Sequence, residues 1–326
     1  MRFHASPPVH TANGAGKTTA ISMWTGLYPP SSGTATICGY SLRTGMAAIY
    51  ERIGVCPQFD ILWPLLTVIE TLTFYAQVKG LPKSQWRYEA AASAASVDLG
   101  HVTERLVSRL SGGMRRRVSL AISLVGGPEV VFLDEPTTGL DPETKRAMWT
   151  LIDLAKAQRS IVLTTHSMEE ADALCSRIGI MAHGSLRCLG PSLHLKRKFG
   201  AGFHVEISYT QGKRDDAITF VQSLLPSSTL AAESAAAITF LAPRGATQLS
   251  ALFESMQKRP ESAGVSGWAL RQTSMEEVFL RIAREAEAQF LSDLPVQPPS
   301  KTWRTQTQGK VTPASRSEVQ MEAVSA

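Results

Sequence analysis

The sequence of 326 residues predicts an α/β fold, in which a larger domain with a buried parallel sheet precedes a smaller α+β domain. Residues 130–133 and 161–165 are unbroken runs of apolar and β-branched residues, as expected for parallel strands that are covered on both faces. Amphipathic helices alternate with such runs, which is typical of a parallel sheet. Chains of this length commonly form about two domains of roughly 150 residues each.

Glycine and proline mark the expected boundaries of these domains. The larger domain is expected over residues 13–190, with a helical insertion over about 61–125, where strand patterns fade. Gly190-Pro191 and the glycines at 200 and 202 separate it from the smaller domain. Three segments are expected outside the larger domain. They are an N-terminal segment that does not match the rest (1–12), a small α+β sandwich of the ferredoxin-like type (200–285) and a disordered tail rich in Pro, Gln, Ser and Thr (286–326).

Two helices of the larger domain have clear ends in the sequence. The helix after Ser111 places Met114, Val118, Ala121, Ile122 and Val125 on one face, and it is expected to stop at residues 126–128, Gly-Gly-Pro. The second helix begins at Asp141-Pro142, an acidic N-cap followed by proline. Its predicted apolar face consists of Met148, Leu151, Ile152 and Ala155.

The smaller domain is predicted from short alternating elements. Strand patterns cover residues 203–209, 237–241 and, more weakly, 265–270, and helical patterns cover 215–225 and 247–258. Ser274 and Glu277 have the spacing of a capping box, which would open a last helix with Met275, Val278, Phe279 and Ile282 on one face.

The composition is that of an ordinary globular protein, with 44% hydrophobic and 19% charged residues. No run of 18 apolar residues predicts a transmembrane helix, and the N-terminus lacks the apolar core of a signal peptide. The four cysteines lack the spacing of metal ligands and predict reduced structural thiols.

The net charge of +5 includes two basic clusters, residues 115–117 and 196–198. We expect both clusters to face solvent. No aromatic or Arg-rich binding module accompanies them, so nucleic-acid binding is not indicated.

Residues 13–19 form a glycine-containing loop that runs directly into a helix. Its members are Asn13, Gly14, Ala15, Gly16, Lys17, Thr18 and Thr19. Backbone N–H groups of such a loop turn inward around phosphate oxygens, and the helix N-terminus adds roughly half a positive charge. Lys17 is expected to reach the β- and γ-phosphates of ATP, and the Thr18 hydroxyl to bind Mg²⁺. The phosphate-loop pattern has glycine where this sequence has Thr11.

Four polar residues are candidates for the chemistry at these phosphates. Asp134 follows the strand at 130–133 and can hold Mg²⁺ through water, and Glu135 would act on the attacking water. Gln58 could offer a carbonyl to Mg²⁺, and His166, at the end of the 161–165 strand, could contact the γ-phosphate. A loop glutamine or a strand-end histidine is often only structural, so Gln58 and His166 gain their significance from the other residues.

Ser111, Gly112 and Gly113 open a helix much as the phosphate loop does. They offer a hydroxyl, bare backbone N–H groups and a helix dipole, which together suit a second phosphate contact. One chain needs only one such helix start for one ATP, whereas two chains arranged head to tail would use both. The alternative is an ordinary N-cap that happens to be followed by glycines.

These motifs resemble those of a known family. LSGGMRRRVSLA, VVFLDEPTTGLDP and TTHSMEEAD are similar to the signature, the Walker B motif with D-loop, and the H-loop of ABC-transporter nucleotide-binding domains. IGVCPQFDILWPLLTVIETL resembles the Q-loop region of the eukaryotic A subfamily, whose members move lipids. SMEEVFLRIARE looks like the end of that subfamily's C-terminal regulatory domain, and the similarity spans about residues 13–285.

The resemblance implies a role for each matching position. Lys17, Thr18 and Thr19 would bind the phosphates, Gln58 and Asp134 would complete the Mg²⁺ site, Glu135 would promote water attack and His166 would sense the γ-phosphate. Ser111, Gly112 and Gly113 would close on ATP held by a second nucleotide-binding domain, with Asp141 at that contact. The implied partners are that second domain and transmembrane domains, whose coupling helices would face Gln58 and the helical insertion, with a lipid as the transported substrate. The implied location is the cytoplasmic face of a membrane.

The departures from the family pattern lie before residue 13. No strand feeding the loop and no adenine-stacking aromatic residue is recognisable in residues 1–12, and the transmembrane segments are absent, so we expect a chain truncated at its N-terminus. Two alternatives to an ATP-hydrolysing cassette of a lipid transporter stay open. One is a catalytically impaired fragment that acts only by binding a partner cassette, and the other is the ATPase subunit of a bacterial-type drug or polysaccharide exporter.

Overall fold

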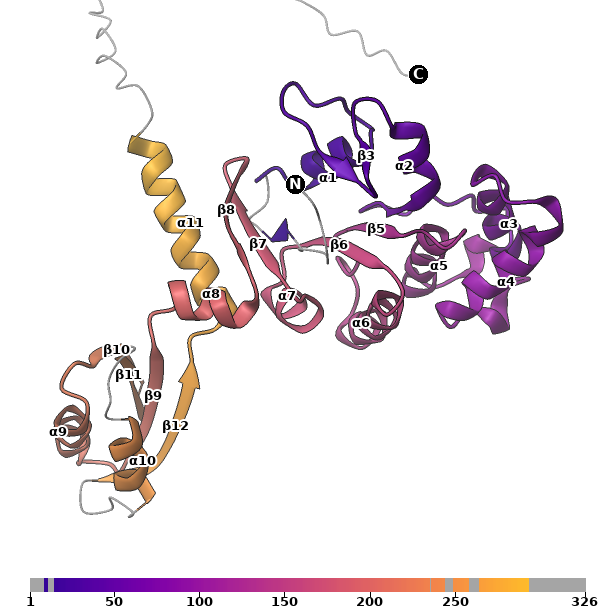
Figure 1. Cartoon of the computed structure of the whole chain (residues 1–326). Coiled ribbons are helices and arrows are strands. Elements are labelled where there is room, and N and C mark those ends of the chain that lie inside the picture. Colours follow the sequence, from indigo (N-terminus) through magenta and orange to yellow (C-terminus); the bar gives the residue numbers. More distant parts are fainter. Residues whose placement is uncertain (1–8, 11–14, 235, 244–248, 258–263, 293–326) are drawn as a thin grey trace, which may run out of the picture.

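The largest of the three sheets formed by the described residues has six strands and forms the centre of the N-terminal part of the molecule (Figure 1). The computed structural model describes residues 9–10, 15–234, 236–243, 249–257 and 264–292. The strand order is β4-β5-β6-β1-β7-β8. The strands are β4 (Ile53–Cys56), β5 (Val130–Asp134), β6 (Ser160–Thr165), β1 (Val9–His10), β7 (Ile178–Ala182) and β8 (Ser185–Gly190). All neighbours pair in parallel except β7 and β8, so the two predicted buried strands are confirmed as β5 and β6.

The strand β1 corrects the expectation that no strand leads into the phosphate loop. Val9 and His10 pair in parallel with Thr164 and Thr165 of β6 on one side and with Gly179 and Ile180 of β7 on the other. A short strand in the middle of a sheet is specified by ladder bonds from both neighbours, and two residues after Pro7-Pro8 are too few to show any hydrophobic period.

Helices cover this sheet and connect its strands. Between β1 and β4 lie α1 (Lys17–Trp24), a hairpin of β2 (Thr36–Ile37) and β3 (Tyr40–Ser41), and α2 (Met46–Arg52). After β5 come α6 (Pro142–Lys156) and α7 (Met168–Leu174), and after β8 comes α8 (Ser192–Phe199). The predicted apolar face of α6 is confirmed, because Met148 and Ile152 are buried in the main core.

The expected helical insertion is present beside the β4–β5 edge of the sheet (Figure 1). It contains α3 (Val68–Val78), α4 (Trp86–Ser96) and α5 (Gly112–Leu124), with 3₁₀ turns at Lys83–Gln85, Gly100–Val102 and Val107–Arg109. Thr67 and Glu70 close a complete capping box at the start of α3.

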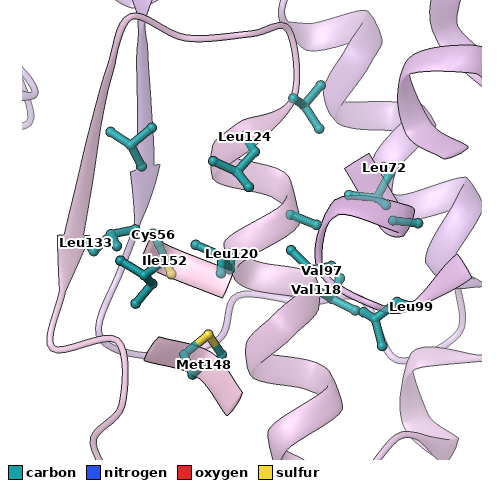
Figure 2. Close-up of a cluster of buried hydrophobic side chains, with 14 of the residues drawn as sticks. Cys56, Leu72, Val97, Leu99, Val118, Leu120, Leu124, Leu133, Met148 and Ile152 are labelled. Atoms are coloured by element: carbon teal, nitrogen blue, oxygen red, sulfur yellow. The ribbon is translucent and has the colours of Figure 1, made fainter. Parts of the chain in front are cut away.

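The helix α5 joins this insertion to the sheet. Figure 2 shows its residues Val118, Leu120 and Leu124 between two groups of buried side chains. One group belongs to the insertion and includes Leu72, Val97 and Leu99, and the other belongs to the sheet and α6 and includes Cys56, Leu133, Met148 and Ile152. A single core therefore links the insertion to the strand that carries Asp134.

The C-terminal unit is a four-stranded antiparallel sheet with the order β10-β11-β9-β12. Its elements follow one another as β9 (Phe203–Tyr209), α9 (Arg214–Leu224), β10 (Thr229–Glu233), β11 (Ala237–Ala242), α10 (Leu249–Gln257) and β12 (Val265–Gln272). The strand β10 was not predicted. All five of its residues are exposed, so no alternation of apolar and polar residues marks it in the sequence.

The last helix, α11 (Met275–Ser292), packs on the first sheet rather than on the C-terminal one. Its residues Met275, Val278 and Ile282 share a core with Ile178 and Ile180 of β7. The helix runs seven residues into the segment 286–326 that was expected to be disordered (286 to 292), and residues 293–326 lie outside the described part of the chain. The expectation was wrong for 286–292, because Ala286 is buried and Phe290 stacks on His183.

The capping box predicted for α11 is half formed. The Ser274 hydroxyl accepts a hydrogen bond from the Glu277 N–H at 3.1 Å, as expected. The Glu277 carboxylate, however, binds His204 Nε2 of β9 and the Arg271 guanidinium of β12, each at 2.7 Å. The charged Arg271 guanidinium competes better for this carboxylate than the backbone N–H of residue 274 does.

Within the described residues, none of the helices combines the length and the apolar character required to cross a bilayer.

Candidate nucleotide-binding site

Seven of the residues predicted to bind ATP or to act on it meet in one cavity of about 230 Å³. It lies where α1 begins, beside the segment after β4 and the C-terminal end of β5. The cavity is lined by Ala15, Gly16, Lys17, Thr18, Thr19, Gln58 and Glu135. Asn13, Gly14 and the departure at Thr11 lie outside the described residues.

The start of α1 lines this cavity and has no side-chain cap. Gly16 is the N-cap residue, and its φ of +95° is a left-handed conformation that favours glycine. Because glycine has no side chain, this helix has no side-chain N-cap. The hairpin between β7 and β8 supports the loop, because the Gly184 N–H donates to the Ala15 carbonyl at 3.2 Å. Lys17 is buried, whereas Thr18 and Thr19 are exposed.

Glu135 is the centre of the polar contacts in the cavity. One carboxylate oxygen, Oε1, lies 3.4 Å from Lys17 Nζ. The other oxygen, Oε2, accepts hydrogen bonds from Gln58 Nε2 at 3.2 Å and Thr138 Oγ1 at 3.1 Å, and it lies 3.4 Å from His166 Nδ1. The structure therefore brings together Lys17, Gln58, Glu135 and His166, which come from four separate segments.

The backbone of Glu135 is in an unusual conformation for a residue with a side chain. Its φ is +47°, in the left-handed region, which costs on the order of 1 kcal/mol or more for a residue other than glycine. Two bonds hold it there, because the Glu135 N–H donates both to the carbonyl and to the hydroxyl of Thr164 at 3.1 Å. The chain turns at Glu135, directly after the end of β5, and the Glu135 side chain lines the cavity.

Asp134 and His166 lie at the ends of the neighbouring strands β5 and β6. Asp134 is buried at the end of β5, and its Oδ1 accepts a hydrogen bond from the Thr164 hydroxyl. His166 follows β6, and about half of its side chain is exposed. Among the described residues, no cluster of three His, Cys, Asp or Glu side chains is suited to hold a metal ion on its own.

The remaining predicted residues do not line this cavity. The Ser111 hydroxyl caps α5 by accepting from the Met114 N–H at 3.2 Å, and Ser111 and Gly112 are exposed. Asp141 caps α6 by accepting from the N–H groups of Glu143 and Thr144 at 3.1 and 3.0 Å. The two caps are neighbours, because a Cβ added at Gly113 would lie 2.6 Å from Thr144 Cγ2. Ser111, Gly112, Gly113 and Asp141 thus form a separate, exposed surface.

One residue contradicts the expectation that the basic cluster at 115–117 faces solvent. Arg116 is only 4% exposed, and its guanidinium donates to groups on both sides of the cavity. Ser119 and Ser123 follow Arg116 at helical spacing, and both are buried as well. These small residues form a second inward face of α5 beside the apolar one.

Taken together, the phosphate loop before α1, the acid pair after β5 and the helical insertion define an ATP-binding cassette. A family model described as ABC transporter matches residues 11–138. ABC transporter A family member 2 of Arabidopsis thaliana is 46% identical over 288 residues, which cover 84% of this chain and 29% of that protein. The phospholipid-transporting ATPase ABCA3 of Homo sapiens is 43% identical over 274 residues, which cover 83% of this chain and 16% of that protein.

Solved structures agree with this assignment. The ATP-binding subunit of an ABC transporter matches with a TM-score of 0.54 and 27% identity, covering 60% of this chain and 82% of that chain. The subunit cbiO1 of Clostridium perfringens, part of the cbiONQ complex, matches with a TM-score of 0.55 and 25% identity, covering 61% and 83%. The chain belongs to the ABC transporter family as an ABC-type ATPase domain, and its sequence is similar to A family members. It spans less than a third of the length of the curated relatives it matches.

Proposed function

We propose that this chain binds ATP with Mg²⁺ and hydrolyses it to power transport by transmembrane domains on the cytoplasmic face of a membrane. The observation that carries the proposal is the meeting of Lys17, Gln58 and His166 around the Glu135 carboxylate, which lines the cavity together with Lys17 and Gln58. The cavity combines a helix N-terminus for phosphate, a cation and a candidate base, which are the parts that phosphoryl transfer to water requires.

Residues of the loop and of the strand ends divide the binding between them. The N–H groups at the start of α1 and the Lys17 ammonium would hold the β- and γ-phosphates, together with Asn13, Gly14, Ala15, Gly16, Thr18 and Thr19. Mg²⁺ prefers oxygen ligands and is commonly held by one or two carboxylates together with substrate phosphates. Thr18, Gln58 and Asp134 offer such oxygens, so the residues present fit this ion.

Glu135 is suited to act on water because its carboxylate reaches into the cavity from a fixed backbone turn. When a triphosphate engages Lys17, Oε1 would lose this partner and become free to accept a proton from the attacking water. Gln58 and His166 both contact Oε2, so they would orient the carboxylate, and the exposed part of His166 would contact the γ-phosphate.

A second cassette would complete the site. Ser111, Gly112 and Gly113 lie on an exposed helix start outside the cavity of their own chain, with Asp141 beside them. Closure of two chains head to tail would place these residues on the γ-phosphate bound by the partner. Hydrolysis would then depend on dimerisation, as the two-site arrangement requires.

The surface after Gln58 is the proposed contact with transmembrane domains. The segment between β4 and α3 exposes the large apolar side chains of Phe59, Ile61, Trp63 and Leu65. Trp63 packs edge-on against Phe74 of α3, with ring centroids 4.8 Å apart. Apolar side chains gathered on one surface are typical of a protein contact. Similarity to a phospholipid-transporting ATPase supports a lipid as the transported substrate.

We propose that residues 200–285 form a regulatory domain that follows the nucleotide-binding domain of residues 13–190, with β9 to β12 as its ferredoxin-like part and with α11 packed on the first sheet. Its βαββαβ succession and its strand order support the ferredoxin-like assignment. A regulatory role is supported by the position of α11, because Phe279 and Leu280 line a cavity of about 320 Å³ together with His166 and Ser167. Movement of α11 would change the surroundings of His166, the proposed contact with the γ-phosphate.

The substitution Glu135→Gln tests the proposal. It should leave binding of ATP intact and slow hydrolysis by about 100-fold or more, because the amide cannot accept the proton. The variant should accumulate as a dimer with ATP and Mg²⁺, but not with ADP, in light scattering after gel filtration. Glu143→Gln, at the exposed start of α6, is the matched control and should hydrolyse ATP normally.

Normal turnover by the Glu135→Gln variant would remove Glu135 from its proposed role. A wild-type chain that binds a partner cassette without hydrolysing ATP would instead support the alternative of a catalytically impaired fragment.

A further inference from the structure

Arg116 is a buried cation whose hydrogen-bonding capacity is fully used. A guanidinium has five N–H donors, and all five are engaged here. Nε donates to the Pro136 carbonyl at 2.7 Å, and Nη1 donates to the Pro57 carbonyl at 2.7 Å and to Asp60 Oδ1 at 3.0 Å. Nη2 donates to the carbonyls of Asp134 and Glu135, both at 3.2 Å.

These acceptors belong to two segments, and Arg116 itself belongs to a third. Pro57 precedes Gln58, and Asp60 follows it two residues later. The carbonyls of residues 134–136 surround the turn at Glu135. Arg116 lies in the second turn of α5, which begins with the exposed signature residues. One side chain thus joins the three segments that carry Gln58, Glu135 and Ser111.

The contacts are directed at the strained part of the site. Nη2 donates to the carbonyls of Asp134 and Glu135, and Nε donates to the carbonyl of Pro136. These three consecutive carbonyls flank the Cα atom of Glu135, whose φ is +47°. On the opposite side, Asp60 supplies the countercharge, and its Oδ1 also accepts from the Ser119 hydroxyl at 2.8 Å. A buried arginine needs such a carboxylate, because an unpaired charge in the interior is costly.

We infer that Arg116 is a positioning residue for ATP hydrolysis, which holds Gln58 and Glu135 in register with the signature end of α5. It acts through these residues and does not touch the nucleotide. A shift of α5 on closure with a partner would be transmitted directly to the Glu135 turn and to the Gln58 segment. This inference rests on the proposed function of the cavity.

The first test compares Arg116→Met with Arg117→Met in the full chain. Arg117 is the neighbouring residue, whose guanidinium only pairs with exposed Asp98 at 3.0 Å. Arg116→Met should lower kcat by about 10- to 100-fold, because small misplacements of catalytic groups have effects of that size. The Kd of ATP and the number of sites should change less than about 3-fold, because the phosphate loop is untouched, and Arg117→Met should match the wild type.

A double substitution separates positioning from a general loss of structure. In a Glu135→Gln background, Arg116→Met should lower kcat little further, since residues that act as a unit have non-additive effects. Arg116→Lys keeps the charge but offers three donors from one point, so it should recover only part of the lost kcat. If the Arg116 variants fold poorly, Asp60→Ala removes the countercharge from the Gln58 side and should reduce kcat in the same direction.

Hydrogen–deuterium exchange provides a readout that does not depend on activity. Arg116→Met should speed amide exchange in peptides that cover residues 57–60 and 134–138, and Arg117→Met should not. Unchanged exchange in both peptides would overturn the inference, as would additive loss of kcat in the double variant. A wild-type chain without hydrolysis would contradict the proposed function instead, and the exchange comparison would still decide whether Arg116 ties the two segments.

Discussion

Two helices of this protein, α1 and α5, begin in similar sequences but in opposite surroundings. The helix α1 begins directly after Gly16, and α5 begins with Gly112. Both have a hydroxyl residue near the N-terminus. The start of α1 opens into a cavity that it shares with Gln58 and Glu135 of the same chain. The start of α5 is exposed, and a Cβ added at Gly112 would meet nothing within 4 Å.

Under the proposed function, this difference assigns each helix start to one half of the nucleotide site. At α1, Gly16 is left-handed and no side chain caps the helix, and the helix start lines the cavity. At α5, the Ser111 hydroxyl satisfies the Met114 N–H, while the open space at Gly112 permits close approach by another molecule. We therefore treat α1 as the half that binds ATP within the chain and α5 as the half that awaits a partner, and substitutions in each half should have separable effects.

The largest effect is expected from Lys17→Met, in the α1 half. Lys17 is buried and its ammonium faces the cavity, so its loss removes a positive charge from a site built for phosphates. Affinity for ATP should fall by about 30-fold or more, as for removal of one partner from a buried charged contact. Fluorescence titration with a labelled ATP analogue measures this change, and Lys83→Met, at an exposed position, is the control. Retained affinity would show that α1 is not the nucleotide-binding half.

A large but different effect is expected from Ser111→Arg, in the α5 half. The arginine would fill the open surface that a partner needs, so ATP-dependent dimerisation and hydrolysis should be lost. The Kd of ATP for the monomer should stay within about 3-fold, because the cavity at α1 is unchanged, although loss of the N-cap should cost about 1 kcal/mol of stability. Calorimetric titration and light scattering with ATP test both statements. Loss of ATP binding by the monomer would contradict the division into two halves.

A smaller effect should distinguish the two glycines at the start of α5. Gly112→Ala adds a methyl group to open space, so the free energy of unfolding should stay within about 0.5 kcal/mol of the wild type. Its dimerisation with ATP should nevertheless weaken several-fold. Gly113→Ala places the methyl 2.6 Å from Thr144 Cγ2 and should cost about 1 kcal/mol of stability through overpacking. Urea unfolding and light scattering separate the two, and equal effects of both alanines would argue against an external partner at Gly112.

Much of the nucleotide site was predictable because strand ends are marked in the sequence. Continuous apolar runs identified β5 and β6, and the polar residues that follow parallel strands must emerge at the same edge of the sheet. Glu135 and His166 follow these two strands, and in the structure Glu135 Oε2 and His166 Nδ1 lie 3.4 Å apart. The roles proposed for these residues rest on the geometry and still await the substitutions described above.

The parts that sequence could not predict are those fixed by tertiary contacts. Arg116 is buried where it donates to five acceptors from residues 57–60 and 134–136. These acceptors are distant from Arg116 in the sequence, so no local sequence pattern predicts them. The strand β1 has only two residues, and β10 is exposed throughout, so neither shows a periodic signal. The end of α11 was missed because its contacts, Phe290 with His183 and Gln289 with Arg187, involve a hairpin about a hundred residues away in the chain.

The smallest effect is expected at the start of α6, which lies beside the start of α5 and is a third helix start to set against the other two. There the Asp141 carboxylate already occupies the first N–H groups, so this helix start is closed to phosphate. Hydrogen bonds from the Thr144 side chain and backbone hold the pKa of Asp141 below its ordinary value. A carboxyl group with a lowered folded-state pKa stabilises the fold above its unfolded-state pKa, and this contribution is lost as the pH falls through the folded-state pKa.

The substitution Asp141→Asn therefore has a pH-dependent consequence. The wild type should be the more stable protein at pH 7, and the difference in urea midpoint should shrink as the pH falls below about 4, where the unfolded chain binds a proton at residue 141. Thr144→Val, which removes the side-chain donor, should show the same trend more weakly. A difference that stays constant from pH 7 to pH 3 would mean that the charge of Asp141 does not serve the helix. Asp141 would then be held in place only for the partner surface that it shares with Gly113.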